Sequence, residues 1–244
     1  MVRGSMSQQA QPGNEAAAGA GSSRPSASRT VNDLFAVAAL LLMAVATGRS
    51  RLSGAHPSKE VKAAVAAARA FGATVELAPD AIVVSGLGTG VLLEPVQSVD
   101  LSGAPLTAAL LTGLLSSHDV PVTLMGEGVA DLSDLFLPIG LQVEAKSHAR
   151  VSLRGSNMPP PREWQVEVGD LVKVLAILLS AVNTPGLTGI AQEDGGDPRI
   201  ARLFQRFGVG VAVAETGQGG VMLSITGRQP LTGSVIEMTA LVAV

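Results

Sequence analysis

Three acidic residues stand where they could act as an acid or a base in a reaction. Asp33 and Asp170 each precede a long apolar run, and Glu127 lies in a Gly-Glu-Gly segment that follows the apolar residues 121–125. A carboxylate held next to a reacting group can take up or release a proton in the transition state. We therefore take these three residues as candidate catalytic groups.

A second set of polar residues flanks the same apolar runs and could bind a substrate. The start of a helix presents unpaired backbone amides and a positive dipole, so the heads of the predicted helices are natural places for a ligand. The candidate substrate-binding residues are Arg29, Asn32, Thr107, Lys173, Asp197 and Arg199.

Most of these residues also have a purely structural interpretation. Asp33 and Asp170 lie at predicted helix starts, and Asp197 precedes a proline, so each carboxylate could simply cap a helix. Lys173 could extend its amine to solvent. Both interpretations remain open from the sequence.

Metal and thiol chemistry are not expected. His56, His118 and His148 lie in different segments without the spacing of metal ligands, and the chain has no cysteine for a disulfide, a thiolate or a zinc site. We expect no metal and no other cofactor.

Composition excludes several partners. Of the 244 residues 47% are hydrophobic and 2% aromatic, the net charge is −3, and no cluster of Lys and Arg is present to neutralise nucleic-acid phosphates. The apolar run 35–46 is too short to cross a bilayer. We expect a cytoplasmic protein with helices buried in its interior.

Three glycines at equal intervals indicate an internal repeat. Gly72, Gly140 and Gly208 stand 68 residues apart, and each follows a bulky apolar residue and opens a strand-like run. A fixed long period is typical of one supersecondary unit used several times. We predict a single α/β (α+β) domain over 29–244, built from three βαβαββ units.

The units are expected at about 29–97, 98–163 and 164–244. Each has one helix that is apolar on every side and a second, shorter helix. The apolar helices are predicted at 30–46, 106–116 and 171–182, and the second helices at 58–71, 132–139 and 198–207.

The two ends of the chain are predicted to differ. A last strand at 234–238 is expected to pair back with the first unit. Residues 1–28 read as a cloning remnant followed by a disordered tail rich in Gln, Ala, Gly, Ser and Pro.

The triple βαβαββ pattern resembles one domain of the enolpyruvyl transferases, the family of 5-enolpyruvylshikimate-3-phosphate synthase and UDP-N-acetylglucosamine enolpyruvyl transferase. The resemblance covers about residues 29–244 and implies an inside-out α/β barrel, or prism, with the apolar helices at its centre. Members of the family have two such domains facing each other across a cleft, so the resemblance covers one of the two.

The family's binding motifs are degenerate here. Residues 29–34 read Arg-Thr-Val-Asn-Asp-Leu where the family has Lys-Ser-x-Ser-x-Arg, and 103–109 read Gly-Ala-Pro-Leu-Thr-Ala-Ala where it has Asn-Ser-Gly-Thr-x-x-Arg. Of Ser-Ala-Gln-x-Lys only Lys173 is kept, and residues 196–199 (Gly-Asp-Pro-Arg) match Ser-Arg-Asp-His within one residue of register.

These departures predict that phosphoenolpyruvate transfer has been lost. Positions that would supply cations or neutral donors to phosphate are apolar, small or acidic, and a buried phosphate without partners is costly. We expect instead a cyclase, isomerase or lyase-type enzyme of specialised metabolism, such as antibiotic biosynthesis. Its substrate would be a largely apolar, polyketide-like small molecule, because orientation alone can accelerate such reactions.

Two other hypotheses remain. The chain could be a non-catalytic binding or scaffold protein, or one half of a two-chain transferase. In either case a face that the family covers with its second domain would be exposed, and exposed apolar surface often marks an interface, so we predict a homodimer.

Overall fold

The computed structural model describes residues 27–193, 196–217 and 219–243. The predicted cloning remnant and nearly all of the predicted tail lie outside these residues. Residues 27 and 28, which were predicted as part of the tail, lie in the first helix. No helix within the described residues is long and apolar enough to cross a membrane.

The first of three sheets joins both ends of the chain. Its strand order is β12-β1-β3-β2, with β12 parallel to β1 and the other pairs antiparallel. The predicted pairing of the last strand with the first unit is thus observed between β12 and β1, where Ile236 aligns with Leu52. The elements of this part are α1 (Ala27–Ala44), β1 (Thr47–Ser53), α2 (Lys59–Ala70), β2 (Thr74–Ala78), β3 (Ala81–Leu87), β12 (Val235–Glu237) and α6 (Met238–Val242).

Each of the other two sheets likewise has one parallel pair and two antiparallel pairs of strands. Their strand orders are β4-β5-β7-β6 and β8-β9-β11-β10. The elements of the second sheet and its helices are β4 (Val99–Asp100), α3 (Pro105–Ser116), β5 (Pro121–Met125), η1 (Ser133–Ile139), β6 (Gln142–Ser147) and β7 (Arg150–Arg154). Those of the third are β8 (Glu163–Gln165), α4 (Leu171–Ala181), β9 (Leu187–Gln192), α5 (Pro198–Arg206), β10 (Val211–Glu215) and β11 (Val221–Thr226).

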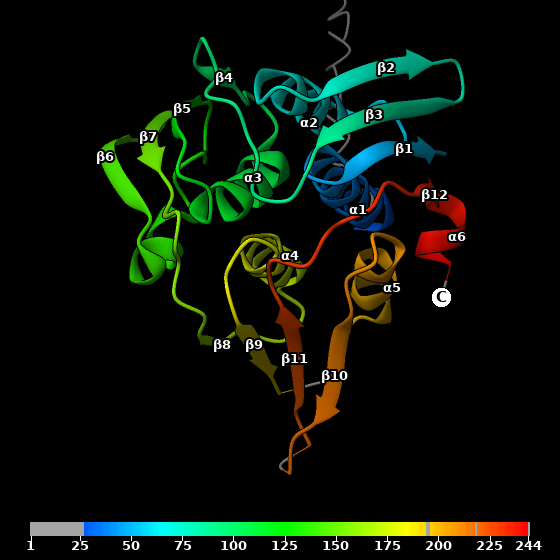
Figure 1. Ribbon diagram of the computed structural model, residues 1–244, viewed down its shortest axis with the longest axis vertical. Coiled ribbons are helices and arrows are strands. Elements are labelled where there is room, and N and C mark those ends of the chain that lie inside the picture. Colours follow the sequence, from blue (N-terminus) through cyan, green and yellow to red (C-terminus); the bar gives the residue numbers. More distant parts are fainter. Residues whose placement is uncertain (1–26, 194–195, 218, 244) are drawn as a thin grey trace, which may run out of the picture.

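Three apolar helices form the centre of the molecule. In Figure 1, α1, α3 and α4 lie in the middle and the three sheets lie around them. Every residue from 34 to 46 is buried, and so is every residue from 174 to 181. The predicted burial of these helices on all sides is confirmed. They are helical because Leu and Ala favour this backbone, and they are stable because each buries its whole circumference.

The sheets approach the C-terminal ends of the central helices at three glycines. A Cβ atom would lie 2.2 Å from the carbonyl oxygen of Met43 at Gly86, 1.9 Å from that of Leu115 at Gly155, and 2.0 Å from that of Thr184 at Gly227. Backbone atoms block the space in each case, so only a residue without a side chain fits.

The three evenly spaced glycines each follow the end of a helix. Gly72, Gly140 and Gly208 have φ angles of 102°, 97° and 84°, a left-handed conformation that glycine adopts without strain. One predicted helix differs in type: residues 133–139 form a 3-10 helix that contains Pro138. Proline lacks the amide hydrogen that an α-helix needs inside the helix, which explains the difference.

His118 is a buried titratable group at the end of α3. It is 2% exposed, its Nδ1 lies 2.8 Å from the carbonyl oxygen of Leu114, and its Nε2 has no hydrogen-bond partner among the described residues. A carbonyl oxygen can only accept, so Nδ1 carries the hydrogen. Burial lowers the pKa of His118 to about 4, against a smaller raising effect of the bond to Leu114. The ring is therefore neutral in the folded protein at pH 7.

This depressed pKa predicts a loss of stability on mild acidification. Below about pH 6.5 the unfolded chain binds a proton at His118 that the folded protein does not bind until about pH 4. The free energy of unfolding should thus fall by about 2 kcal/mol between pH 7 and pH 5 on account of this residue. Urea denaturation at both pH values measures the loss. The loss of unfolding free energy should be about 2 kcal/mol smaller in His118→Gln than in the wild type. The exposed control His56→Gln should lose as much as the wild type. A loss in His118→Gln equal to that of the wild type would contradict the assignment.

Candidate functional site

The head of α1 contributes three predicted residues to one small cavity. Arg29, Asn32 and Asp33 line a space of about 230 Å³ together with the β1–α2 segment 54–56 and the first turn of α6. Asp33 does not cap the helix, because α1 begins at Ala27 and Asp33 lies inside it. The capping interpretation of Asp33 was wrong, and its side chain is left for another role.

Asp33 is a buried carboxylate facing this cavity. Its residue is 8% exposed, and within the described part of the chain its carboxylate makes no hydrogen bond or ion pair. Its oxygens are not among the fully buried side-chain atoms that lack a partner in the described residues, which leaves them available to the cavity. A ligand that donates a hydrogen bond would find an acceptor there.

A larger, apolar groove adjoins the small cavity. It has a volume of about 650 Å³, lies between α2 and the sheet strands β1, β2 and β3, and shares Gly54, Ala55 and His56 with the cavity at Asp33. Its apolar lining residues are Leu52, Val61, Val65, Ala66, Leu77 and Ile82. The sequence alone did not indicate this groove, because nothing in the strand pattern marks its lining residue Leu77 as exposed.

The head of α3 is occupied by a carboxylate from α2. Glu60 accepts hydrogen bonds from the backbone amides of Leu106 at 3.1 Å and Thr107 at 2.8 Å, and from the Thr107 hydroxyl at 2.8 Å. Thr107 is completely buried. Glu60 therefore closes the helix N-terminus that could otherwise hold an anion. It was predicted on the polar face of its helix, yet it is only 9% exposed.

The head of α4 is occupied by its own cap. Asp170 accepts a hydrogen bond from the backbone amide of Lys173 at 3.0 Å, which confirms the capping interpretation. The Lys173 amine lies 2.9 Å from the second carboxylate oxygen of Asp170. This contact raises the pKa of Lys173, so the amine is paired with its neighbour and does not simply extend into solvent.

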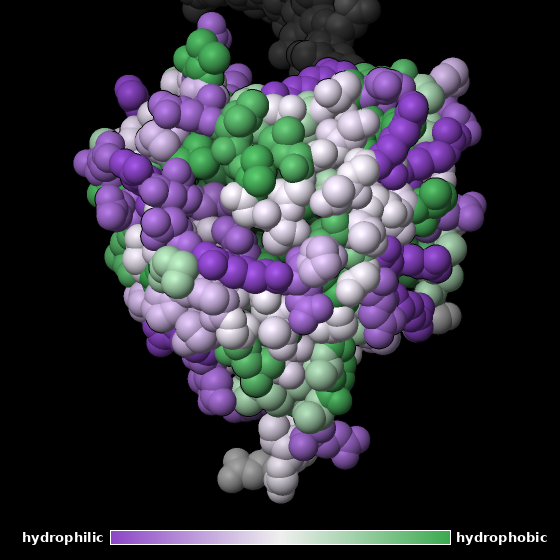
Figure 2. Space-filling model, viewed as in Figure 1, coloured by the Kyte–Doolittle hydropathy of each residue, from purple (hydrophilic) through white to green (hydrophobic). Residues whose placement is uncertain are grey.

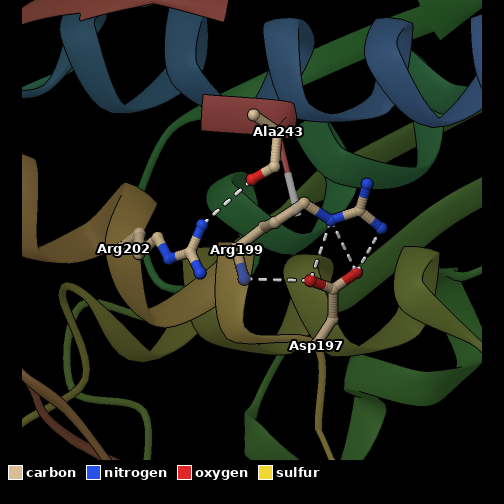
Figure 3. A network of polar contacts seen from close by, with 4 residues as sticks. All are labelled: Asp197, Arg199, Arg202 and Ala243. Atoms are coloured by element: carbon tan, nitrogen blue, oxygen red, sulfur yellow. Dashed lines mark hydrogen bonds and ion pairs between the residues drawn. The ribbon is translucent and has the colours of Figure 1, made fainter. Parts of the chain in front are cut away.

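The head of α5 has the same arrangement (Figure 3). Asp197 caps the helix at the backbone amide of Arg199 and also accepts from the Arg199 guanidinium. Burial raises the pKa of Asp197, but the hydrogen bonds and charge of Arg199 outweigh it and leave the pKa below its ordinary value. The guanidinium carbon of Arg199 also lies 5.0 Å from the centre of the Phe35 ring, and Arg202 donates to the carbonyl oxygen of Ala243.

The structure brings some of the predicted residues together and separates others. Arg29, Asn32 and Asp33 share one cavity. Glu127 lies in an exposed turn after β5 and lines neither that cavity nor the apolar groove. Within the described ranges, no three His, Asp or Glu side chains gather closely enough to hold a metal ion.

Comparison with known proteins identifies relatives of the chain. No family model matches it. It is 30% identical over 215 residues to a 3-phosphoshikimate 1-carboxyvinyltransferase of Rhodospirillum rubrum, covering 83% of this chain and 48% of that protein. It is 28% identical over 201 residues to the protein of the same name from Novosphingobium aromaticivorans, covering 79% and 46%.

The fold matches a solved structure of the same kind. The EPSP synthase of Acinetobacter baumannii superposes with a TM-score of 0.71 at 18% identity, over 83% of this chain and 47% of that one. The chain is thus a relative of the enolpyruvyl transferases, with their mixed α/β fold of four-stranded sheets. It spans about half the length of the relatives it matches.

Removal of the Glu60 carboxylate tests whether it closes the head of α3. Glu60→Ala should lower the free energy of unfolding by about 2 kcal/mol, because the backbone amides of Leu106 and Thr107 lose their acceptor, while the Thr107 hydroxyl keeps the backbone carbonyl of residue 60. Glu60→Gln, which keeps one acceptor oxygen, should lose less. The opened head should then bind inorganic phosphate, so phosphate should raise the Tm of Glu60→Ala more than that of the wild type.

A surface variant provides the control for this experiment. Glu76 pairs with Arg49 at 2.8 Å, and both side chains are more than half exposed. Glu76→Ala should therefore cost less than about 1 kcal/mol and show the wild-type response to phosphate. The same phosphate response in all four proteins would show that Glu60 does not close an anion site.

Proposed function

We propose that this relative of the enolpyruvyl transferases has lost phosphoenolpyruvate transfer and acts on a largely apolar small molecule. The observation that carries the proposal is the Asp33 carboxylate, which lines a small cavity beside an apolar groove and makes no hydrogen bond or ion pair within the described residues. The reaction would be of the cyclase, isomerase or lyase type, in specialised metabolism such as antibiotic biosynthesis.

The charges at the helix heads support the loss of transfer. Glu60, Asp170 and Asp197 place carboxylates at the heads of α3, α4 and α5. Lys173 and Arg199, which could have bound phosphate, are paired with two of these carboxylates. At the heads of α4 and α5 the cations are thus already neutralised, and at the head of α3 a phosphorylated substrate would meet the Glu60 carboxylate, whose like charge repels it.

Asp33 is the best placed of the three predicted acid–base residues. It faces a cavity, whereas Asp170 is held by a cap and an ion pair and Glu127 lies in an exposed turn. A single positioned carboxylate can accelerate proton transfer by about two to four orders of magnitude. The groove would hold the rest of the molecule in a reactive shape, and orientation supplies a further part of the acceleration.

We also propose an architecture, an alternative role and a cellular setting for the chain. The shared strand order of the three sheets supports a triplicated βαβαββ unit and an inside-out barrel. A non-catalytic binding or scaffold role is the alternative, favoured by the structural capping roles of Asp170 and Asp197. We also keep the proposal that the chain is one half of a two-chain transferase. A cytoplasmic location and a homodimer are proposed as well, and sedimentation would test the homodimer.

Replacement of Asp33 tests the proposed function. A thermal-shift panel of apolar, hydroxylated and amine-bearing compounds should yield ligands that raise the Tm of the wild type. Asp33→Asn should bind these ligands at least tenfold more weakly, because a neutral amide accepts hydrogen bonds less strongly than a carboxylate. The exposed control Glu94→Gln should bind them as the wild type does.

Turnover separates an enzyme from a binding protein. Once a ligand from the panel proves to be a substrate, kcat of Asp33→Asn should fall by about a hundredfold or more. Unchanged kcat would remove Asp33 as the acid or base. Equal ligand affinity in Asp33→Asn and the wild type would remove it from the site altogether.

A further inference from the structure

The apolar groove has the size and lining of a small-molecule site. Its volume of about 650 Å³ lies within the range of about 300–1,000 Å³ that is usual for ligand pockets. One wall is a stripe of α2 that includes Val61, Val65 and Ala66, and the other is the face of the sheet at Leu77 and Ile82.

Small and exposed apolar residues keep this groove open. Leu77 lies on β2, the edge strand of its sheet, and is 64% exposed. A leucine side chain is costly to leave in water. Ala66 is exposed on the opposite wall, and Ala78 and Ala81 lie at its base on the sheet side. A bulkier residue at position 66 would fill the space.

The groove adjoins the cavity at Asp33 along one short segment. Gly54, Ala55 and His56 line both spaces. Gly54 has a φ angle of 72°, and a Cβ atom there would contact Met238 of α6 at 3.7 Å. Gly54 and His56 are exposed, so a ligand that occupies both spaces would pass over this segment at the surface.

Three charged side chains line the groove, and two of them are engaged with the protein itself. Arg69 donates to the carbonyl oxygen of Val75 at 2.7 Å, and Asp80 pairs with Arg51 at 2.8 Å. The third is Lys62, which can only donate hydrogen bonds. A ligand head that itself donates hydrogen bonds is thus better matched at Asp33, whose carboxylate accepts them and has no partner among the described residues.

We propose that groove and cavity form one site for an amphiphile, with an apolar body in the groove and a hydrogen-bond-donating head, an amine or a hydroxyl, at Asp33. This inference rests on the proposed function and names its ligand class. The protein has few aromatic residues to stack on rings, so aliphatic contacts from Val, Leu, Ile and Ala hold the body. The carboxylate would accept a hydrogen bond from the head, beside Arg29, which lines the same cavity.

Alkyl probes of defined length test both halves of the site. The probes are n-alkylamines, n-alkanols and n-alkanoates of six to ten carbons, each below its micelle concentration, measured by displacement of Nile red. For the wild type, affinity of the amines should rise roughly threefold for each added methylene group. Amines should bind at least tenfold more tightly than alkanoates of the same length.

Two variants and a matched control assign the effects. Ala66→Trp should remove the dependence on chain length and keep the preference for amines. Asp33→Asn should remove the preference for amines and keep the dependence on length. Ala212→Trp, at an exposed alanine on β10 of the third sheet, should behave as the wild type. Unchanged thermal unfolding of each variant shows that it is folded.

The possible failures can be told apart. If Asp33→Asn abolishes binding while chain length and Ala66→Trp have no effect, the groove is not part of the site and only the proposed function stands. If length and Ala66→Trp matter while Asp33→Asn changes nothing, the proposed role of Asp33 fails and the amphiphile site with it. No binding of any probe overturns the inference.

Discussion

The burial of three apolar helices against three surrounding sheets is the constraint on which the rest of the structure depends. Gly86, Gly155 and Gly227 let sheet backbone reach the C-terminal ends of α1, α3 and α4, where a Cβ atom would collide with helix carbonyl oxygens. Interiors packed this closely tolerate little change in volume. The view in Figure 2 shows the outer side of this arrangement, with apolar surface over the connection between β3 and β4 and polar surface around it. Fixed at their ends in this way, the helices set the positions of every polar group at their heads.

Those heads are occupied by the chain's own carboxylates, which supports the proposed loss of phosphoenolpyruvate transfer. A helix N-terminus attracts an anion through its free amides and dipole. A carboxylate accepts hydrogen bonds from these amides at three heads: Glu60 at α3, Asp170 at α4 and Asp197 at α5. At α1 the carboxylate of Asp33 lies inside the helix and faces a cavity instead. The chemistry available to an incoming ligand is therefore concentrated at α1, next to the apolar groove.

The fold was largely predictable from the sequence because its signals are local and repeated. The glycines at 72, 140 and 208 and the three apolar runs placed most helices and strands within a few residues of their observed bounds. The site was much less predictable. Glu60 reaches a helix head 46 residues further along the chain, and no local pattern records such a contact. The alternative interpretation of Asp33 as a helix cap was wrong because the residues before it, from Ala27 on, are already part of α1. The groove depends on how α2 lies over the sheet, which only the tertiary structure defines.

The most direct test is an NMR titration of the 244-residue chain with phosphoenolpyruvate, following the backbone amides at the heads of α3, α4 and α5. If the chain's own carboxylates close these heads, the amide signals of Thr107, Lys173 and Arg199 should not shift up to millimolar ligand. Saturable shifts of these three amides at micromolar concentration would show that the heads still bind phosphate and would contradict the account.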